Sequence, residues 1–398
     1  MQASQAIQGL NGGGADGWEL FYRARRLVED GVPVTELTIG EHDIGTDASI
    51  LEAMDRSARG GHTGYAVVPG VTELRDAVAA RVAARTGVPT TRDNVLITAG
   101  GQAGLFASHF ATCDPGDTAL YIDPYYATYP GTLRAAGARA VAVAARAEDG
   151  FQPREADLKQ AATAHNPRTL LINTPNNPTG GVYSDQTLDG IARVCVGHDL
   201  WLISDEVYDT QVWQGRHASP RALPGMADRT LVIGSMSKSH AMTGSRIGWI
   251  VGPETMINHL ITLAIHTTYG VAGYIQDAAL FALSQGQSLE AQVADPFRRR
   301  RALAVNILAG QNVVRALPPS GAMYLMLDIR ATGLSGVAFA ETLLERHQIA
   351  VMPGESFGAA AAGHLRVAMT VEDARFAAAL EKIVEFASER ATGTAATG

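Results

Sequence analysis

The sequence is poor in cysteine, with only Cys113 and Cys195 in 398 residues. Both lie in apolar segments with helical spacing, so they offer neither a disulfide framework nor the ligand spacing of a metal site. Long apolar runs are missing too, and none reaches the length that spans a membrane. Residues 1–14 are polar and glycine-rich, without the apolar core of a signal peptide. We therefore expect no bound metal, no membrane partner and a cytoplasmic location.

Positive charge is also scarce, since the formal net charge is −8. An acidic protein gains nothing from approaching nucleic acid or an anionic membrane, so nucleic acid is not expected as a partner. The one basic cluster is the run of four arginines at residues 298–301. It lies in a helical pattern, and we expect it to be a solvated or interface face.

The sequence does contain a series of short apolar runs, at residues 95–97, 119–122, 140–144, 170–172, 200–203, 231–233 and 247–251. Segments with helical period separate most of them. This alternation predicts an α/β fold with a mostly parallel, seven-stranded sheet sandwiched by helices. After residue 253 long helices and three further strands predict a smaller α+β domain. We expect a large domain at residues 45–290, a small domain at 15–44 and 291–390, and disordered ends at 1–14 and 391–398.

Ligands of open α/β sheets collect beyond the carboxyl ends of the strands, so the residues that follow each run are informative. Five of these runs end in unusual segments: Thr98-Ala-Gly-Gly-Gln102, Asp123-Pro-Tyr-Tyr126, Asn173-Thr-Pro-Asn-Asn-Pro-Thr-Gly180, Asp205-Glu-Val-Tyr208 and the stretch from Gly234 to Gly248. Each has an ordinary structural explanation by itself, such as a turn, a helix cap or a solvated loop.

The last of these segments carries Lys238, the only lysine between Lys159 and Lys382. A lysine in a tight turn can form a Schiff base with a carbonyl compound when desolvation or a nearby cation lowers its pKa. Together the five segments offer a glycine turn for a phosphate, an aromatic ring, an asparagine, a carboxylate and a lysine. Pyridoxal phosphate requires this set, because its aldehyde needs a lysine and its ring nitrogen needs a carboxylate.

The ordered motifs Asn-Asn-Pro-Thr-Gly, Asp-Glu-Val-Tyr and Ser-x-Ser-Lys-x(7)-Arg-Ile-Gly resemble those of the fold-type I, class I/II aminotransferases, in particular the bacterial aspartate aminotransferase-like branch. The resemblance covers roughly residues 18–385, and an ordered set is far more specific than one motif. It implies the two-domain fold of aspartate aminotransferase and a pyridoxal-phosphate-dependent transaminase that is a homodimer with active sites at the subunit interface.

The resemblance also implies roles for individual residues. Lys238 would form the Schiff base and shuttle the substrate proton, and Asp205 would pair with the pyridinium nitrogen. The remaining cofactor contacts would come from Gly101, Gln102, Ser235 and Arg246 at the phosphate, Tyr126 on the ring, Asn177 and Tyr208 at the 3-oxygen, and Tyr65 reaching the phosphate of the other subunit. Arg366, assisted by Gly40 and Asn177, would bind the substrate α-carboxylate.

Two departures from the family pattern bear on the substrate. The frequent Gly-Glu-Pro-Asp-Phe is here Gly40-Glu-His-Asp-Ile44, and the lysine that aspartate-specific relatives often carry is here Gln102. The missing cation predicts a neutral or aromatic amino donor, with 2-oxoglutarate or pyruvate as acceptor. The motifs leave open a β-eliminating C–S lyase, which would share every cofactor residue. A cofactor-binding regulator is a remote alternative, because no basic segment precedes residue 18.

Overall fold

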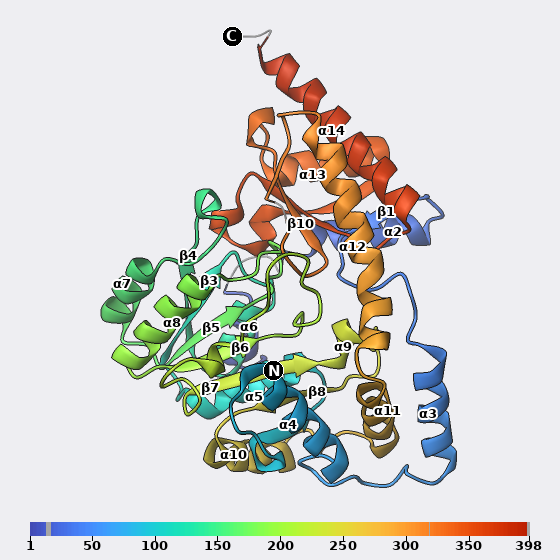
Figure 1. The fold of residues 1–398 in the computed structure, drawn as a ribbon. Coiled ribbons are helices and arrows are strands. Elements are labelled where there is room, and N and C mark those ends of the chain that lie inside the picture. The colour runs from blue at the N-terminus through green and yellow to red at the C-terminus, as the bar shows by residue number, and fades with distance from the viewer. Residues whose placement is uncertain (13–16, 318, 396–398) are drawn as a thin grey trace.

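The computed structural model describes residues 1–12, 17–317 and 319–395, and their strands form two separate sheets (Figure 1). The larger sheet has seven strands in the order β2-β8-β7-β6-β5-β3-β4. Only β8 runs antiparallel to its neighbours, β2 and β7. The strands are β2 (Val95–Thr98), β3 (Thr118–Asp123), β4 (Arg139–Ala144), β5 (Thr169–Asn173), β6 (Trp201–Asp205), β7 (Thr230–Ser235) and β8 (Gly248–Val251). The predicted mostly parallel, seven-stranded sheet is confirmed.

Helices cover both faces of this sheet, as its nearly continuous apolar strands require. Leu170 and Ile172 pack against α7 and α8, whereas Leu171 between them packs on the opposite face with α5, α6 and α10. The helices are α3 (Ala48–Arg59), α4 (Thr72–Thr86), α5 (Gly101–Thr112), α6 (Tyr129–Ala135), α7 (Glu155–His165), α8 (Asp185–Gly197), α9 (Met236–Ser239), α10 (Glu254–Ile265) and α11 (Gly273–Ser284).

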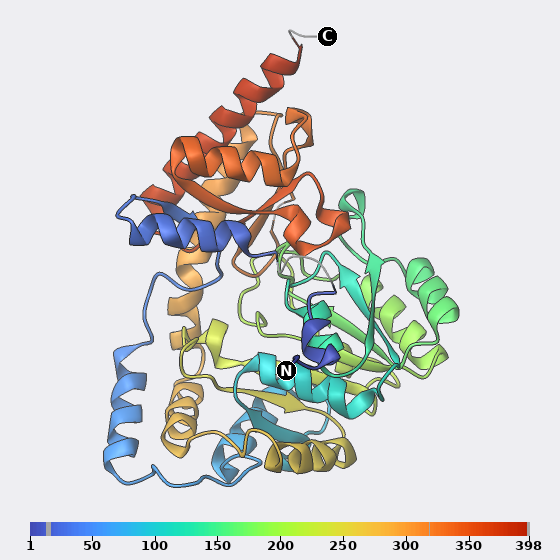
Figure 2. The same cartoon turned by 180° about the vertical axis from the view of Figure 1, so that it is seen from behind.

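The second sheet has five strands in the order β1-β11-β12-β10-β9. These are β1 (Thr35–Leu37), β9 (Arg315–Leu317), β10 (Tyr324–Asp328), β11 (Ile349–Pro353) and β12 (His364–Ala368), packed with α2 (Glu19–Glu29), α12 (Gln287–Ala309), α13 (Gly336–His347) and α14 (Asp373–Ala395). β1 pairs in parallel with β11, which brings the N-terminal and C-terminal parts of the chain together. Figure 2 shows the blue α2 beside the orange-red α13. Short 3-10 helices complete the fold at Arg92–Asn94, Ala147–Asp149, Pro220–Ala222, Arg330–Thr332, Gly354–Phe357 and Ala359–Ala361.

The division into a large domain at 45–290 and a small domain at 15–44 with 291–390 stays a prediction. The proposed boundary at residue 290 falls in the first turn of α12, which reaches from the large sheet to the small one (Figure 1). The chain ends differ from the expectation of disorder. Ser4 caps a short helix, α1 (Gln5–Gln8), and α14 continues to Ala395. Residues 13, 14 and 396–398 lie outside the described residues. No described helix combines the length and the apolar character that crossing a membrane requires.

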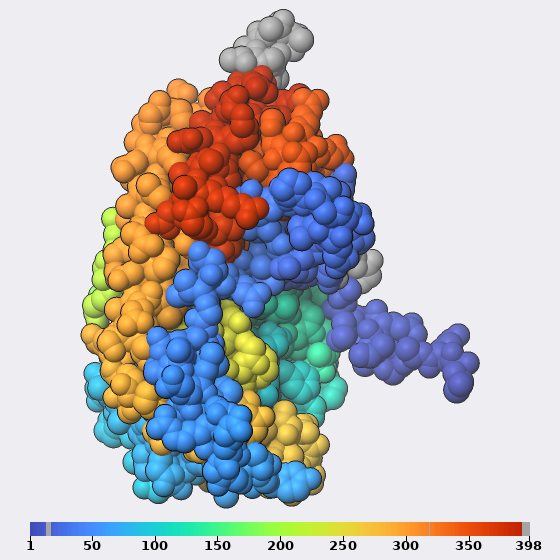
Figure 3. Space-filling view, turned by 90° about the vertical axis from the view of Figure 1, so that its right-hand side faces the viewer, coloured from blue at the N-terminus to red at the C-terminus, as the bar shows by residue number. Residues whose placement is uncertain are grey.

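The four-arginine run is expected to be a solvated or interface face, and within it Arg300 is only 3% exposed. Its Nη1 and Nη2 donate to both oxygens of Asp43, at 2.9 and 2.6 Å, and its Nε donates to Asp373 at 2.8 Å. Asp43 belongs to the loop that leaves β1 and descends over the outside of the molecule toward α3, in blue in Figure 3. Arg300 therefore fixes this loop, residues 40–44, to α12.

Replacing Arg300 with leucine should lower the free energy of unfolding by about 3 kcal/mol, because the substitution leaves two carboxylates without their shared buried partner. Denaturant titration should show a lower midpoint with an unchanged slope. Arg298→Leu is the matched control in the same helix. Arg298 is 56% exposed and pairs with Asp295, so its loss should cost less than about 1 kcal/mol. Equal losses in the two variants would contradict an anchoring role for Arg300.

Candidate active site

A cavity of about 280 Å³ lies at the carboxyl ends of β5, β6 and β7 and extends to the second sheet. Eleven of the twelve residues singled out from the sequence line it: Gly40, Gly101, Gln102, Tyr126, Asn177, Asp205, Tyr208, Ser235, Lys238, Arg246 and Arg366. The exception is Tyr65. Its side chain is 92% exposed and lies edge-on to Tyr269 at a ring distance of 5.3 Å, outside the cavity of its own chain.

Lys238 lies on α9, the short helix that follows β7. Its Nζ donates a hydrogen bond of 2.5 Å to the carbonyl oxygen of Gly40. Its backbone carbonyl accepts from Gln211 Nε2 at 3.0 Å and from His42 Nε2 at 3.2 Å. These contacts fix the lysine at both ends and leave the amine in the cavity.

The amine is held by a neutral carbonyl, so little offsets the cost of burying its charge. Desolvation lowers the pKa of Lys238 to about 8. The charge of Glu41 raises this pKa, and the charges of Arg246 and Arg366 lower it further. A substantial fraction of the lysine is therefore neutral near physiological pH, as a nucleophile or a general base requires.

Asp205 ends β6 and is 4% exposed. Tyr129 Oη donates to its Oδ2 at 2.7 Å, and the backbone N–H of Val207 donates to Oδ1 at 3.3 Å. Burial raises the pKa of Asp205 to about 6, although these two hydrogen bonds lower it. A buried carboxylate of this kind favours a cation beside it. The sequence analysis missed Tyr129, whose only signal was its place three residues after Tyr126, at the start of a helix.

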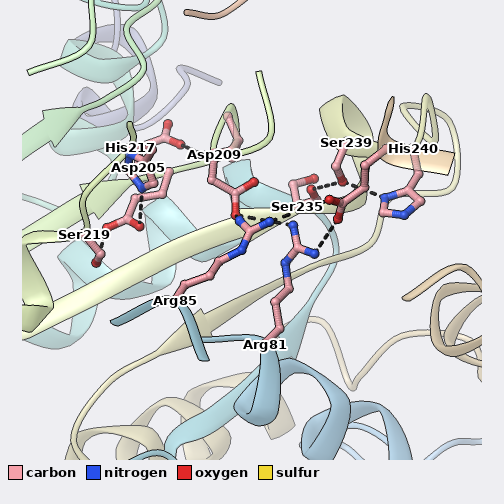
Figure 4. A network of polar contacts seen from close by, with 12 residues as sticks. Arg81, Arg85, Asp205, Asp209, His217, Ser219, Ser235, Ser239 and His240 are labelled. Carbon is pink, nitrogen blue, oxygen red and sulfur yellow. Dashed lines mark hydrogen bonds and ion pairs between the residues drawn. The ribbon is translucent and has the colours of Figure 1, made fainter. Parts of the chain in front are cut away.

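Ion pairs fix the segment after Asp205 through side chains that do not line the cavity. Figure 4 shows this network. Glu206 accepts hydrogen bonds from His217 at 2.9 Å and from Ser219 at 2.7 Å. Burial lowers the pKa of His217, but the hydrogen bond and charge of Glu206 outweigh it, so the pKa is raised. The imidazole therefore favours its charged form beside Glu206.

Asp209 continues this network three residues further along the chain. It pairs with Arg85 and lies 3.5 Å from Arg81, which also pairs with Glu290 (Figure 4). Burial raises the pKa of Asp209, but the charges of the two arginines more than compensate, so the net shift is downward. The segment from Asp205 to Asp209 thus has one side in the cavity and the other side held by opposite charges.

Arg366 lies in β12, is 1% exposed and faces the cavity from the second sheet. Its Nη1 donates to Asn177 Oδ1 at 3.0 Å, and its Nη2 donates to the carbonyl oxygen of Thr38. The guanidinium lies between two rings, with its Cζ 4.3 Å from the centroid of Phe357 and 4.6 Å from that of Tyr324. Since its hydrogen bonds go to neutral groups, its charge is available to an anion in the cavity.

The opposite end of the cavity is built around the start of α5. Gly100 has φ +80°, and a Cβ there would lie 2.4 Å from Arg246 Nη2, so the turn requires glycine. Arg246 is held by a 2.7 Å hydrogen bond from its Nη1 to the carbonyl oxygen of Thr243. Ser235 donates to the carbonyl oxygen of Ile247 at 3.2 Å. A helix start beside an arginine is an arrangement that binds phosphate.

Gln102 extends from this helix start to α6. Its Nε2 donates to Thr132 Oγ1 at 2.6 Å, and its Oε1 accepts from Thr128 Oγ1 at 3.2 Å. Both ends of the amide are therefore fixed. The side chain presents no cation to the cavity.

The chain is similar to known proteins along most of its length. The family described as Aminotransferase class I and II matches residues 32–383. The arginine–pyruvate transaminase of Pseudomonas aeruginosa is 41% identical over 371 residues, 93% of this chain and 94% of the relative. The aspartate/prephenate aminotransferase of Thermus thermophilus is 36% identical over 366 residues, 90% and 92% of the two chains.

Comparison with solved structures indicates the same family. A Thermus thermophilus aspartate aminotransferase with maleate superimposes with a TM-score of 0.90 at 33% identity, covering 97% of this chain and 100% of that one. The aromatic aminotransferase of Pyrococcus horikoshii gives a TM-score of 0.86 at 31% identity, covering 92% and 99%. The chain therefore belongs to the class I and II aminotransferases, pyridoxal-phosphate-dependent enzymes of fold type I, and transfers an amino group from an amino acid to a 2-oxo acid.

Proposed function

We propose that the cavity binds pyridoxal 5′-phosphate, with Lys238 and Asp205 as the catalytic residues. The observation that carries this proposal is the pair of perturbed groups in one cavity, an amine with a pKa of about 8 and a carboxyl with a pKa of about 6. When bound, pyridoxal phosphate supplies an aldehyde that links to amines and a ring that accepts electrons. A cationic ring nitrogen would meet the need of Asp205 for a counter-charge, so the residues present fit the group.

The other residues fit the remaining parts of the cofactor. Gly101, Gln102, Ser235 and Arg246 would hold the phosphate at the start of α5, the place where backbone N–H groups and the helix dipole favour an anion. Tyr126 would pack on the ring, and Tyr208 and Asn177 would donate to the 3-oxygen. Because the two ends of the group are fixed in this way, its reactive carbon would lie beside the Lys238 amine.

The substrate would be oriented by its α-carboxylate. Arg366 offers a planar guanidinium whose fork suits a carboxylate, with Asn177 and Gly40 beside it. The neutral Lys238 amine would take the α-proton as a general base and later deliver it as a general acid. Its bond to the Gly40 carbonyl places the amine beside a residue proposed to assist the carboxylate clamp.

We also propose that the protein is a cytoplasmic homodimer in which Tyr65 serves the cofactor phosphate of the partner. Tyr65 is exposed and lies outside the cavity of its own chain. Several other apolar side chains are exposed too, among them Leu51, Val67, Ile265 and Tyr269. Apolar surface of this kind suits an interface with a second copy of the chain.

For the amino donor, we propose an amino acid without a second carboxylate. Gln102 presents an amide where a distal carboxylate would need a cation, which favours a neutral or aromatic donor. A basic donor is a second candidate. Among the described residues, Glu41 is the only carboxylate besides Asp205 that lines the cavity, and its charge suits a cationic side chain. The name of the Pseudomonas arginine–pyruvate transaminase agrees with such a donor, and it favours pyruvate as acceptor.

Lys238 should be the point of cofactor attachment. Borohydride treatment of the loaded protein should fix the cofactor to the peptide with Lys238, and the other two lysines, Lys159 and Lys382, provide internal controls. The rate of attachment to apoprotein should rise with pH through a midpoint near 8, because only the neutral amine reacts. A solvated lysine would show a midpoint of about 10.4. Lys238→Ala should lose about a thousandfold or more in transamination, whereas label on Lys159 or Lys382 would exclude the assignment.

Asp205→Asn should lower kcat/KM by about three powers of ten, near 4 kcal/mol, because the ring nitrogen loses its counter-charge. Asp123→Asn is the matched control. Asp123 also ends a strand of the large sheet, is 5% exposed and has its pKa raised to about 6 by burial, but it does not line the cavity. Steady-state kinetics should find the control within about tenfold of wild type. A similar small effect for Asp205→Asn would show that Asp205 is only structural.

Donor preference should follow from residue 102. A panel of aspartate, alanine, leucine, phenylalanine and arginine, each with pyruvate and 2-oxoglutarate, should give aspartate a lower kcat/KM than the best donor without a second carboxylate. Gln102→Lys should shift the ratio toward aspartate, since the ammonium offsets the desolvation of the distal carboxylate. An aspartate preference above about a hundredfold in the wild type, near 2.7 kcal/mol, would contradict the proposal.

A further inference from the structure

Tyr324 has no assigned part in the site, yet it is buried in its centre. It begins β10 in the second sheet, is 2% exposed and lines the cavity. The sequence analysis missed it because it lies in an apolar strand without a polar motif around it. Its contacts reach three separate parts of the proposed site.

The hydroxyl of Tyr324 meets both proposed donors to the cofactor's 3-oxygen. It lies 2.9 Å from Tyr208 Oη and accepts from Asn177 Nδ2 at 3.4 Å. A hydroxyl has one proton to donate. If Tyr208 directs its proton to the 3-oxygen, the bond between the two phenols requires Tyr324 as the donor and Tyr208 as the acceptor. Such a donor polarises Tyr208 and strengthens the bond that Tyr208 itself donates.

The ring of Tyr324 meets the carboxylate clamp. It forms one of the two aromatic faces that hold the guanidinium of Arg366, at 4.6 Å. Its hydroxyl also lies against the backbone of Gly40, where a Cβ would be 1.8 Å from Oη, so only glycine fits. Gly40 is the residue whose carbonyl accepts from Lys238.

We propose that Tyr324 is a positioning residue, whose hydroxyl orients Tyr208 and Asn177 toward the 3-oxygen of the cofactor and whose ring supports Arg366. The inference rests on the proposed cofactor site and extends it to a residue of the second sheet. The two parts of this side chain then have separate roles. The hydroxyl tunes the proton affinity at the cofactor, and the ring tunes the affinity for the substrate carboxylate.

The hydroxyl stays protonated across the working range. Burial raises the pKa of Tyr324, although the charge of Arg366 and the hydrogen bond with Tyr208 lower it. The titratable groups around it are Tyr208, Tyr126 and Arg366. Burial raises the pKa values of Tyr208 and Tyr126 as well. A pH-dependent change in the visible spectrum therefore reports the proton at the cofactor rather than a proton on these phenols.

The test is a spectrophotometric pH titration of cofactor-loaded Tyr324→Phe, which keeps the ring and removes the hydroxyl. Weaker donation to the 3-oxygen stabilises the protonated cofactor, so the midpoint should rise by about 0.4 to 1 pH unit, the equivalent of one hydrogen bond. The dissociation constant of 3-phenylpropanoate, a carboxylate that lacks an amine, should stay within about twofold at a pH below both midpoints. Tyr324→Leu should weaken this carboxylate by about three- to tenfold, because one face of Arg366 is lost.

Tyr183→Phe is the control, since the Tyr183 hydroxyl is buried without a hydrogen-bond partner among the described residues and lies outside the cavity. Its midpoint should equal that of the wild type. An unchanged or lower midpoint in Tyr324→Phe, or an equal rise in Tyr183→Phe, would overturn the inference while the cofactor proposal stands. A wild-type protein that takes up no cofactor would overturn both.

Discussion

The hydrogen bond between Lys238 Nζ and the carbonyl of Gly40 links the two sheets at the proposed catalytic amine. A carbonyl fixes the amine without supplying a negative charge, so desolvation prevails and the pKa falls to about 8. A carboxylate in the same place would stabilise the ammonium and remove the nucleophile. The position of Gly40 in turn depends on its loop, which Arg300 ties to α12 through Asp43. An ion pair outside the cavity lining thus holds the loop that carries the carbonyl bonded to the lysine.

Burial also shifts the pKa of Asp205, but upward, because it disfavours the charged carboxylate. The parallel sheet delivers it to the cavity at the end of β6, where burial raises its pKa to about 6. Glu206 and Asp209 do not line the cavity; they meet His217 and the arginines of α4 (Figure 4). Glu206 and Asp209 have cationic partners outside the cavity, whereas Asp205 in the cavity forms no ion pair with a described residue. A cationic ring placed there would complete the charge balance.

Much of the fold was predictable because its elements are local. Each strand of the large sheet is a short apolar run, and in a parallel sheet the residues after such runs must converge at one edge. That rule brought Gly101, Asn177, Asp205 and Lys238 to one cavity before any contact was known. Tyr129, Tyr324 and Arg300 could not be found in this way. Their partners are distant in sequence, as in the contact between Tyr208 and Tyr324, 116 residues apart, and no local pattern marks them.

The proposed cofactor contacts follow from local sequence patterns, whereas the proposed substrate end of the site depends more on contacts between residues distant in sequence. The proposed phosphate and ring contacts come from turns that follow strands of one rigid sheet, so the same motifs can recur in relatives named for arginine, aspartate or aromatic substrates. The proposed substrate contacts come from the loop after β1, from β10 and β12 of the second sheet, and from Gln102 after the glycine turn. On the proposed assignment, a change at Gln102 or in residues 40–44 would alter the donor while the strand ends, and the chemistry proposed for them, stay in place. Donor specificity would then depend on how the second sheet meets the first.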